Sequence, residues 1–283
     1  MKTSQICRSF LLIKDFFSIS FYKKKFINKL MKKIEVIYDA FKSLKIKENF
    51  VIIHSDVVGL EFENFSLSRL WEAIFFGIGS DKTYLLPTFS FSKNKMWDYY
   101  STPSETGVLS EYFRKKISSK RTMHPIHSLA IYGKDANDIP NHNCKSSFGR
   151  GSVWEWLCKN KSVCNLSLGV KLEGGATICH YPEEYLKVNY RQYIPLKVKI
   201  IDKNKKIINS QYTYYARIIN KKSEGNNNWV QCEDDLLKSK ILSRKNFFKN
   251  QYPISVMNAF KATNFIIKKL KKDPEYLGQL YFK

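Results

Sequence analysis

The first two thirds of the chain alternate between strand-like and helix-like patterns of hydrophobic positions. Residues 49–54 and 83–87 are continuous apolar runs of strand length, typical of buried strands. Between them, residues 68–78 place apolar side chains three and four positions apart and end at glycines, which predicts an amphipathic helix. Strand, helix and strand together predict a βαβ unit, in which the two strands pair in parallel through a right-handed crossover.

The same alternation continues towards residue 170. Helices are predicted over residues 107–116 and 152–160, and short strands over residues 129–132 and 162–170. The first of these helices is expected to start at the turn of residues 102–105, because Thr, Pro and an acidic residue are favoured in a first turn. These elements predict an α/β fold with a mixed, largely parallel central sheet that is flanked by helices.

The C-terminal third has a different pattern. Residues 194–201 and 206–215 alternate on either side of a polar turn, which is typical of a β-hairpin with one solvated face. Residues 234–249 and 256–272 are amphipathic. We therefore expect an antiparallel β addition on the C-terminal side of the α/β fold.

We expect one domain behind a short N-terminal extension. Residues 35–283 form the domain, with a core that carries the motifs at about 40–193 and a variable part at 194–283. Residues 1–34 are basic and aromatic, and their apolar run is too short and too interrupted by charge for a cleaved signal peptide. Three interpretations stay open for them: a basic helix that contacts a membrane surface through residues 1–30, an upstream start site, and a plain surface helix.

Composition narrows the class of protein. Of 283 residues, 43% are hydrophobic and 15% aromatic, which is ample for a packed core. No apolar run reaches the ~18 residues of a membrane span. The six cysteines form no CxxC pair, which favours reduced thiols in a cytoplasmic protein over a secreted disulfide framework. The net charge of +23 predicts attraction to polyanions, although lysine spread along the whole chain also fits an AT-rich genome.

Four of the five histidines lie within one stretch of the chain. His124, His127, His142 and His180 fall there, while His54 ends the first apolar run. Histidine changes its charge near neutral pH, so the stretch is a candidate site of acid–base chemistry, with structural hydrogen bonding as the alternative. Its spacing fits no metal site, and we expect no metal.

Five short motifs occur on loops beside these elements. They are His54-Ser55, Leu86-Pro87-Thr88-Phe89-Ser90, Thr102-Pro103-Ser104-x-x-Gly107-x-Leu109-x-Glu111-x-Phe113-Arg114, Arg121-x-x-His124-Pro125-x-x-Ser128 and Thr177-x-x-His180-x-x-Glu183. Together they resemble the aminoglycoside 3-N-acetyltransferase family. The resemblance implies the family's own fold, distinct from the common small acetyltransferase fold. It also implies acetyl-CoA as co-substrate and direct attack of an amine on the thioester.

The resemblance also implies a general base and a carboxylate that orients it. His142 is the expected base, because it precedes the turn Phe148-Gly149-x-Gly151-Ser152 as the family's motif histidine precedes a similar turn; an exposed loop residue is the alternative. Glu183 is the expected carboxylate partner of His142. Thr177 and His180 are expected to line the acyl end of the site, with a purely structural role as the alternative for His180.

Hydroxyl and cationic side chains near strand ends and helix starts are candidates for binding CoA. These residues are Ser55, Thr88, Ser90, Ser104, Arg121, His124 and Ser128. Ordinary capping is the alternative for each of them. His124 is expected to be mainly structural, because a residue before proline is held extended. His127 has no predicted role, and Glu184 is interpreted as a solvent-facing helix residue.

The acceptor is expected to be a small-molecule amine. Asp56, Asp98 and Glu105 are candidate carboxylates for binding it. Because the positive net charge opposes a polycation at long range, the preferred acceptor is a nucleotide-linked amino sugar of surface polysaccharide synthesis. The first alternative is an aminoglycoside antibiotic, and the second is a non-catalytic CoA-binding, membrane-binding or nucleic-acid-binding protein. No nucleic-acid-binding motif occurs, so no nucleic acid partner is expected, and the oligomeric state stays open.

Overall fold

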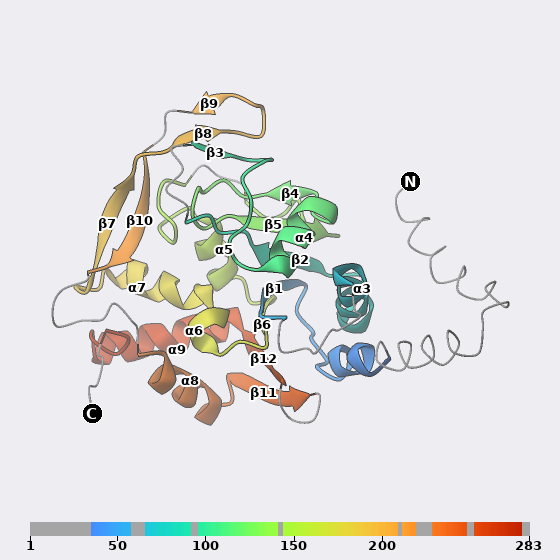
Figure 1. Cartoon of the computed structure of the whole chain (residues 1–283). Coiled ribbons are helices and arrows are strands. Elements are labelled where there is room, and N and C mark those ends of the chain that lie inside the picture. Colours follow the sequence, from blue (N-terminus) through green and yellow to red (C-terminus); the bar gives the residue numbers. More distant parts are fainter. Residues whose placement is uncertain are drawn as a thin grey trace. The chain divides into compact units, whose positions relative to one another are not determined.

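The computed structural model shows two compact units (Figure 1). One comprises residues 1–43 and 63–78, and the other residues 44–62 and 79–283. The structure describes residues 35–57, 66–91, 96–140, 144–208, 211–218, 228–247 and 252–278. The predictions made for the N-terminal extension lie outside these residues.

The described residues of the smaller unit form a pair of helices. Residues 35–42 form the first, and α3 (Leu67–Ile78) is the second, which confirms the predicted helix. The two helices pack closely at Gly77, where a Cβ atom would lie 2.8 Å from the Cβ of Phe41. A side chain at this position would push the helices apart.

The larger unit contains a seven-stranded mixed sheet. Its strands, in spatial order, are β11 (Leu242–Phe247), β12 (Tyr252–Asn258), β6 (Val163–Leu168), β1 (Phe50–Ser55), β2 (Thr83–Pro87), β5 (Leu129–Gly133) and β4 (Lys120–Arg121). The central strands β6, β1 and β2 pair in parallel, while the outer pairs are antiparallel. All strands except β5 and β12 run in the same direction, which confirms the predicted fold class.

The central strands are mostly apolar and are buried on both faces. Every residue of β2 and β6 is buried, as is all of β1 up to its last residue. The helices of this unit are α4 (Val108–Lys116), α5 (Val153–Lys159), α6 (Leu172–Gly175), the 3₁₀-helix η2 (Thr177–Cys179), α7 (His180–Leu186), α8 (Trp229–Lys238) and α9 (Ala259–Lys272). Helix α9 packs against α5 and α7, so the C-terminal helix closes the main core.

The helix start expected at residues 102–105 was wrong. The turn of residues 102–105 does not start α4, which begins at Val108 after Gly107, a residue with a φ of 105° that favours glycine. The turn instead contacts the helix from outside, because the backbone N–H of Ser104 donates to the carboxylate of Glu111. In the C-terminal third, the amphipathic residues 234–249 include β11, and β12 ends within the first residues of the stretch 256–272, most of which forms α9. Strands β11 and β12 extend the central sheet beyond β6.

The predicted hairpin forms, but its strands divide between two small sheets. Strand β7 (Arg191–Leu196) pairs antiparallel with β10 (Tyr212–Arg217), as Figure 1 shows. Strand β8 (Lys199–Ile201) pairs with β9 (Ile207–Ile208) across the polar turn, and also with β3 (Met96–Asp98). The antiparallel addition is therefore confirmed, and β10 brings a tyrosine to the site described below.

Strand directions determine which loops meet. The carboxyl ends of the parallel strands β6, β1 and β2 lie at one edge of the sheet, where open α/β sheets bind ligands. Because β5 is antiparallel to β2, with Leu129 opposite Pro87, its amino end reaches the same edge. Within the described part of the chain, no helix is long and apolar enough to cross a membrane.

Candidate active site

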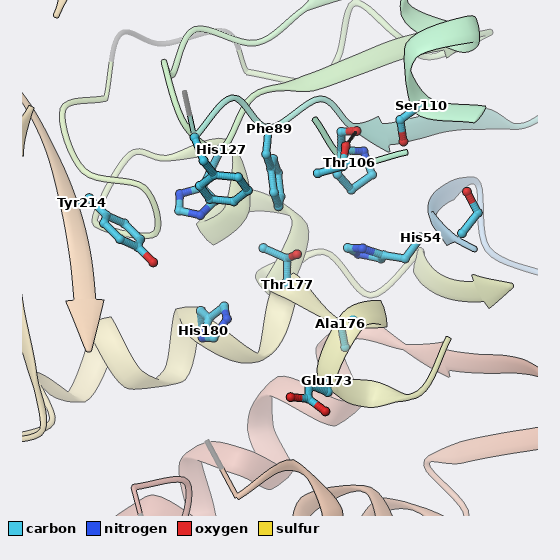
Figure 2. Close-up of a pocket in the computed structure, with 14 residues that line it drawn as sticks. His54, Phe89, Thr106, Ser110, His127, Glu173, Ala176, Thr177, His180 and Tyr214 are labelled. Atoms are coloured by element: carbon cyan, nitrogen blue, oxygen red, sulfur yellow. Dashed lines mark hydrogen bonds between the residues drawn. The ribbon is translucent and has the colours of Figure 1, made fainter. Parts of the chain in front are cut away.

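A cavity of about 330 Å³ opens at this edge of the sheet (Figure 2). The described residues that line it are His54, Ser55, Pro87, Phe89, Phe91, Thr106, Ser110, His127, Glu173, Gly174, Ala176, Thr177, His180 and Tyr214. Figure 2 shows the imidazole rings of His54, His127 and His180 arranged around Thr177. Three of the five motifs therefore each contribute one histidine to the lining of this cavity.

His180 is bonded to a buried carboxylate. Its Nδ1 lies 2.6 Å from Oε2 of Glu183, one turn further along α7. The side chain of Glu183 is fully buried, and its Oε1 forms an ion pair with Arg191, 2.9 Å from Nε. The side chain of His180 is 26% exposed, and the ring lines the cavity. The arrangement is a carboxylate–imidazole pair that is open to the cavity on the imidazole side.

The charges of this pair fix the position of the proton. Burial would raise the pKa of Glu183, but the bond from His180 and the charge of Arg191 outweigh it and lower that pKa. Burial and the Arg191 charge lower the pKa of His180 below 6.5, although Glu183 opposes them. An ionised Glu183 beside a neutral His180 places the ring proton on Nδ1, where it is donated to the carboxylate. Nε2 of His180 then keeps its lone pair.

His127 belongs to a second hydrogen-bonded chain. Nδ1 of His124 accepts from the backbone N–H groups of Ile126, at 3.1 Å, and His127, at 3.0 Å. Oγ of Ser147 lies 3.3 Å from Nε2 of His124 and 2.7 Å from Nδ1 of His127. Burial lowers the pKa of His124 to about 4 and that of His127 well below its usual value. Both rings are therefore neutral, and the structural role predicted for His124 agrees with its contacts.

His54, the residue before the last one of β1, lines the cavity without a hydrogen-bond partner for one ring nitrogen. Its Nε2 and the Oγ of Ser55 are buried and have no hydrogen-bond partner among the described residues. Burial lowers the pKa of His54 to about 3, so its ring is neutral. Buried polar atoms without partners are rare in native proteins and are more frequent where a ligand binds.

Thr177 sits on a loop that β6 holds in place. Asn165 Nδ2 and Ser167 Oγ, both on β6, donate to the carbonyl of Gly175 at 2.7 Å. A Cβ at Gly175 would lie 2.6 Å from Ser167 Oγ, so the close approach needs glycine. This anchor fixes the start of η2 and with it the Thr177 side chain, which points into the cavity in Figure 2.

Most of the side chains predicted to bind CoA contact one another instead of the cavity. Arg121 is buried and donates to Thr88 Oγ1, to Ser128 Oγ and to backbone carbonyls, including that of Thr102 at 2.7 Å. The guanidinium also lies over the ring of Trp97, and burial lowers the pKa of Arg121 to about 9. This cluster braces the loop after β2, and its described contacts are architectural.

Of the remaining residues predicted to bind CoA, one lines the cavity and the others contact neighbouring protein groups. Ser90 donates to the carbonyl of Pro103, and Ser104 shares a hydrogen bond with Thr106, which lines the cavity. Ser55 lines the cavity itself, whereas His124 lies behind His127.

The structure also places the acidic residues. Asp98 accepts backbone N–H groups of its own turn, and Glu105 accepts that of Phe91, so neither lines the cavity. Asp56 is exposed at the end of β1. The carboxylate residue on the cavity wall is Glu173, which the sequence motifs did not indicate.

Two further expectations concern Glu184 and His142. Glu184 is not a solvent-facing residue: it is buried and accepts from Ser146 Oγ, the backbone N–H of Phe148 and the hydroxyl of Tyr193. His142, the expected base, lies outside the described residues. The described histidine that Glu183 binds is His180. Among the described residues, no group of three or more His, Cys, Asp or Glu side chains could hold a metal ion.

The model of one protein family matches most of the chain. It is the model of aminoglycoside 3-N-acetyltransferase, and it matches residues 52–271. The chain belongs to this family. It is therefore an N-acetyltransferase, and acetyl-CoA, the co-substrate expected from the motifs, is the acetyl donor of this family. No curated protein matches the sequence.

Solved structures confirm the fold. The aminoglycoside acetyltransferase AAC(3)-Xa superposes with a TM-score of 0.73 at 16% identity, over 90% of this chain and 99% of that one. AAC-VIa bound to sisomicin gives 0.71 at 16% identity, over 85% and 97%. AAC-IIIb in a binary complex with CoASH also gives 0.71 at 16% identity, over 85% and 96%.

Proposed function

We propose that this protein transfers the acetyl group of acetyl-CoA to an amine of an aminoglycoside, with His180 as the general base and Glu183 as its carboxylate partner. The observation that carries the proposal is the 2.6 Å bond between His180 Nδ1 and the buried Glu183 carboxylate on the cavity wall. It supports the role because it directs the ring proton to Nδ1 and leaves Nε2 able to accept a proton from the amine.

The proposed reaction needs no covalent enzyme intermediate. His180 Nε2 takes one proton from the ammonium group, and the freed lone pair of the nitrogen attacks the thioester carbonyl carbon. The carbon–sulfur bond then breaks with its electron pair on sulfur, and a second nitrogen proton passes to that sulfur. The products are the N-acetyl amide, CoASH and one released proton. A base in this position typically contributes ~10²–10⁴-fold to the rate.

The preferred acceptor follows from the charges on the cavity wall. Glu173 is the charged side chain among the described lining residues, and none of these residues is Lys or Arg. A pyrophosphate would call for cationic partners, whereas an ammonium group suits a carboxylate. The net charge of +23 acts over the whole surface and is screened beyond ~8–10 Å in physiological salt. The nucleotide-linked amino sugar therefore gains no support, and the aminoglycoside alternative is preferred.

Thr177 and Ser55 are proposed to contact the reactants. Both line the cavity, and the hydroxyl of Ser55 has no partner among the described residues. Thr177 is placed to meet the acyl end, because it lies between the three histidine rings in Figure 2. The known relatives bound to sisomicin and to CoASH support a site that holds an aminoglycoside and CoA.

Thiol release from acetyl-CoA tests the function. We expect turnover with sisomicin and none with a nucleotide-linked amino sugar, and we expect expression of the protein to protect susceptible bacteria from the drug. Turnover with the nucleotide-linked sugar alone would overturn the acceptor class. If the protein binds CoA in titration calorimetry but transfers acetyl to no amine, it is a non-catalytic relative, and the proposal fails.

The two candidate bases are separated by parallel variants. His180→Ala is expected to lower kcat by ~10²–10⁴-fold, and His142→Ala by only a few-fold. The opposite ranking would return the role of base to His142, for which Glu183 was first expected to be the partner. Retained CoA binding in both variants serves as the control for an intact site.

A further inference from the structure

We infer that His127 is a catalytic hydrogen-bond donor, held by Ser147 as the Nε2–H tautomer so that it stabilises the negative charge that develops on the thioester oxygen. The inference deepens the proposed function and rests on it for the identity of the reaction. It assigns a role to a histidine for which the sequence motifs gave none.

The hydrogen-bond chain behind His127 has a defined direction. Nδ1 of His124 accepts two backbone N–H groups, so the proton of its neutral ring is on Nε2, which faces Ser147 Oγ. Ser147 is 2% exposed, and its Oγ is bonded to these two histidine rings. If His127 Nδ1 also donated to Ser147, the hydroxyl proton of Ser147 would have no acceptor among the described residues. The satisfied arrangement has the Ser147 hydroxyl donating to His127 Nδ1 at 2.7 Å.

This direction decides what His127 can do in the cavity. With Nδ1 occupied as an acceptor, the ring proton of the neutral imidazole is on Nε2. His127 lines the cavity, and Nε2 is not among the buried atoms of the described chain that lack a partner. The side chain therefore offers a donor to the cavity and has no free lone pair there. It cannot act as the base, and its chemistry complements that of His180, whose Nε2 keeps a lone pair.

The surroundings of His127 make the donor rigid. Its ring packs edge-on against Phe89 and at a tilt of 45° against Phe148, with ring centroids 4.9 Å apart in both pairs. Trp154 Nε1 donates to the carbonyl of His127 at 3.0 Å, which fixes the backbone. Donors that are oriented in advance, in a dry site, need no reorganisation when charge develops, and this is the condition under which an oxyanion donor is most effective.

His127 also lies on the correct side of the reacting atoms. Phe148 contacts both rings, since its centroid is 4.9 Å from His127 and 5.5 Å from His180. Figure 2 shows both imidazoles beside Thr177, with His127 above it and His180 below it in this view. An acetyl group between them would have the attacking nitrogen near His180 and its carbonyl oxygen near His127. As the amine attacks, the carbonyl electron pair moves to oxygen, accepts the Nε2–H bond, and returns when the carbon–sulfur bond breaks.

The tautomer is tested by NMR without any substrate. Long-range ¹H–¹⁵N spectra of the full chain, labelled with ¹⁵N-histidine and assigned with His127→Gln, show which ring nitrogen carries the proton. We expect protonated Nε2 at His127 in the wild type and in Ser147→Thr, and a mixture of tautomers in Ser147→Ala. Ser255→Ala, at an equally buried serine outside the cavity, is the matched control and should leave the His127 signals unchanged. Protonated Nδ1 at His127 in the wild type would overturn the inference.

Kinetics test the role of the donor. His127→Leu is expected to lower kcat by about 10²–10³-fold with little change in KM, because the bond forms only in the transition state. His127→Gln, whose amide N–H can replace Nε2–H, should recover at least about tenfold of this loss. CoA binding and thermal melting of each variant show whether the site is still folded. A rise in KM at constant kcat, or a loss of less than about threefold in His127→Leu, would overturn the inference.

The two proposals can fail separately. A wild-type protein that acetylates no amine would remove the proposed function and the catalytic role of His127 together, while the spectrum would still decide the tautomer. A wild-type protein that acetylates sisomicin, with a fully active His127→Leu variant, would leave the proposed function standing and refute this inference alone.

Discussion

Replacing Glu183 by Gln tests the proposed base most directly. Gln has the same shape, but its amide is neutral and offers N–H donors beside His180 Nδ1. Arg191 Nη2 already lies 3.2 Å from that nitrogen. In the wild type the 2.6 Å bond to the carboxylate decides the tautomer in favour of Nδ1–H. In Glu183→Gln both neighbours are donors, so Nδ1 becomes the acceptor and the ring proton moves to Nε2, which then has no lone pair for the amine.

The expected loss is large because the base is removed without removing the ring. In serine proteases, replacing the Asp of the catalytic triad by Asn gives the wrong histidine tautomer and lowers kcat by about 10⁴-fold. General-base catalysis as a whole contributes ~10²–10⁴-fold to the rate. We therefore expect kcat for Glu183→Gln to fall by ~10²–10⁴-fold, equivalent to about 3–5 kcal/mol in the activation free energy. KM for acetyl-CoA should change little, because the pair takes no part in binding CoA in this scheme.

The assay combines turnover, stability and the tautomer. Glu183 is fully buried against Arg191, so some loss of stability is expected, and thermal melting must show that the variant is folded at the assay temperature. Glu233→Gln is the matched control, since Glu233 pairs with Arg244 at 2.7 Å and does not line the cavity. A folded Glu183→Gln variant that keeps kcat within tenfold, or that keeps Nδ1–H at His180 by ¹⁵N NMR, would refute the reasoning.

Three further predictions follow from single contacts. The positive charge of Arg191 lowers the pKa of His180, and His180 can act as a base only when it is unprotonated. Arg191→Met should therefore move the acidic limb of the pH profile of kcat/KM to higher pH. An acidic limb that does not move would contradict the electrostatic effect of Arg191 on His180. Gly149→Ala should lower the melting temperature, at a cost of about 1–3 kcal/mol, because its Cβ would lie 2.7 Å from Glu184 Oε1. Arg121→Met should destabilise the fold by roughly 3–5 kcal/mol, because it leaves buried backbone carbonyls without a hydrogen-bond donor. If the variant instead has normal stability and loses affinity for CoA, Arg121 is a CoA ligand.

Local pattern was sufficient for the elements around the parallel centre of the sheet. The apolar runs at β1, β2 and β6 and the helical period at α3, α4 and α5 are properties of short windows, so they could be predicted from the sequence. Strand β11 could not, because it is a polar edge strand whose lysine and arginine fit a helix equally well. It becomes a strand through its pairing with β12, which lies far from β6 in sequence.

The sequence by itself determined the family of motifs, the α/β class and the residue types of the site. It did not determine which side chains of those motifs face the cavity. Arg121 and His127 stand in one motif, yet Arg121 faces the protein interior and His127 the cavity, because β5 runs antiparallel to β2 and brings its amino end to the site. Strand direction depends on contacts between segments distant in sequence, and no short pattern encodes it.

Contacts between distant segments also decide which ring nitrogen of each histidine carries the proton. The spacing of His180 and Glu183 places them one helical turn apart, which the sequence shows. The tautomer of each histidine depends on its buried partners. For His180 the partner is the Glu183 carboxylate, which Arg191 on β7 keeps ionised, and for His127 it is Ser147, on the turn before α5. The ring nitrogen that is bonded to an acceptor carries the proton, and only the tertiary structure decides which nitrogen that is.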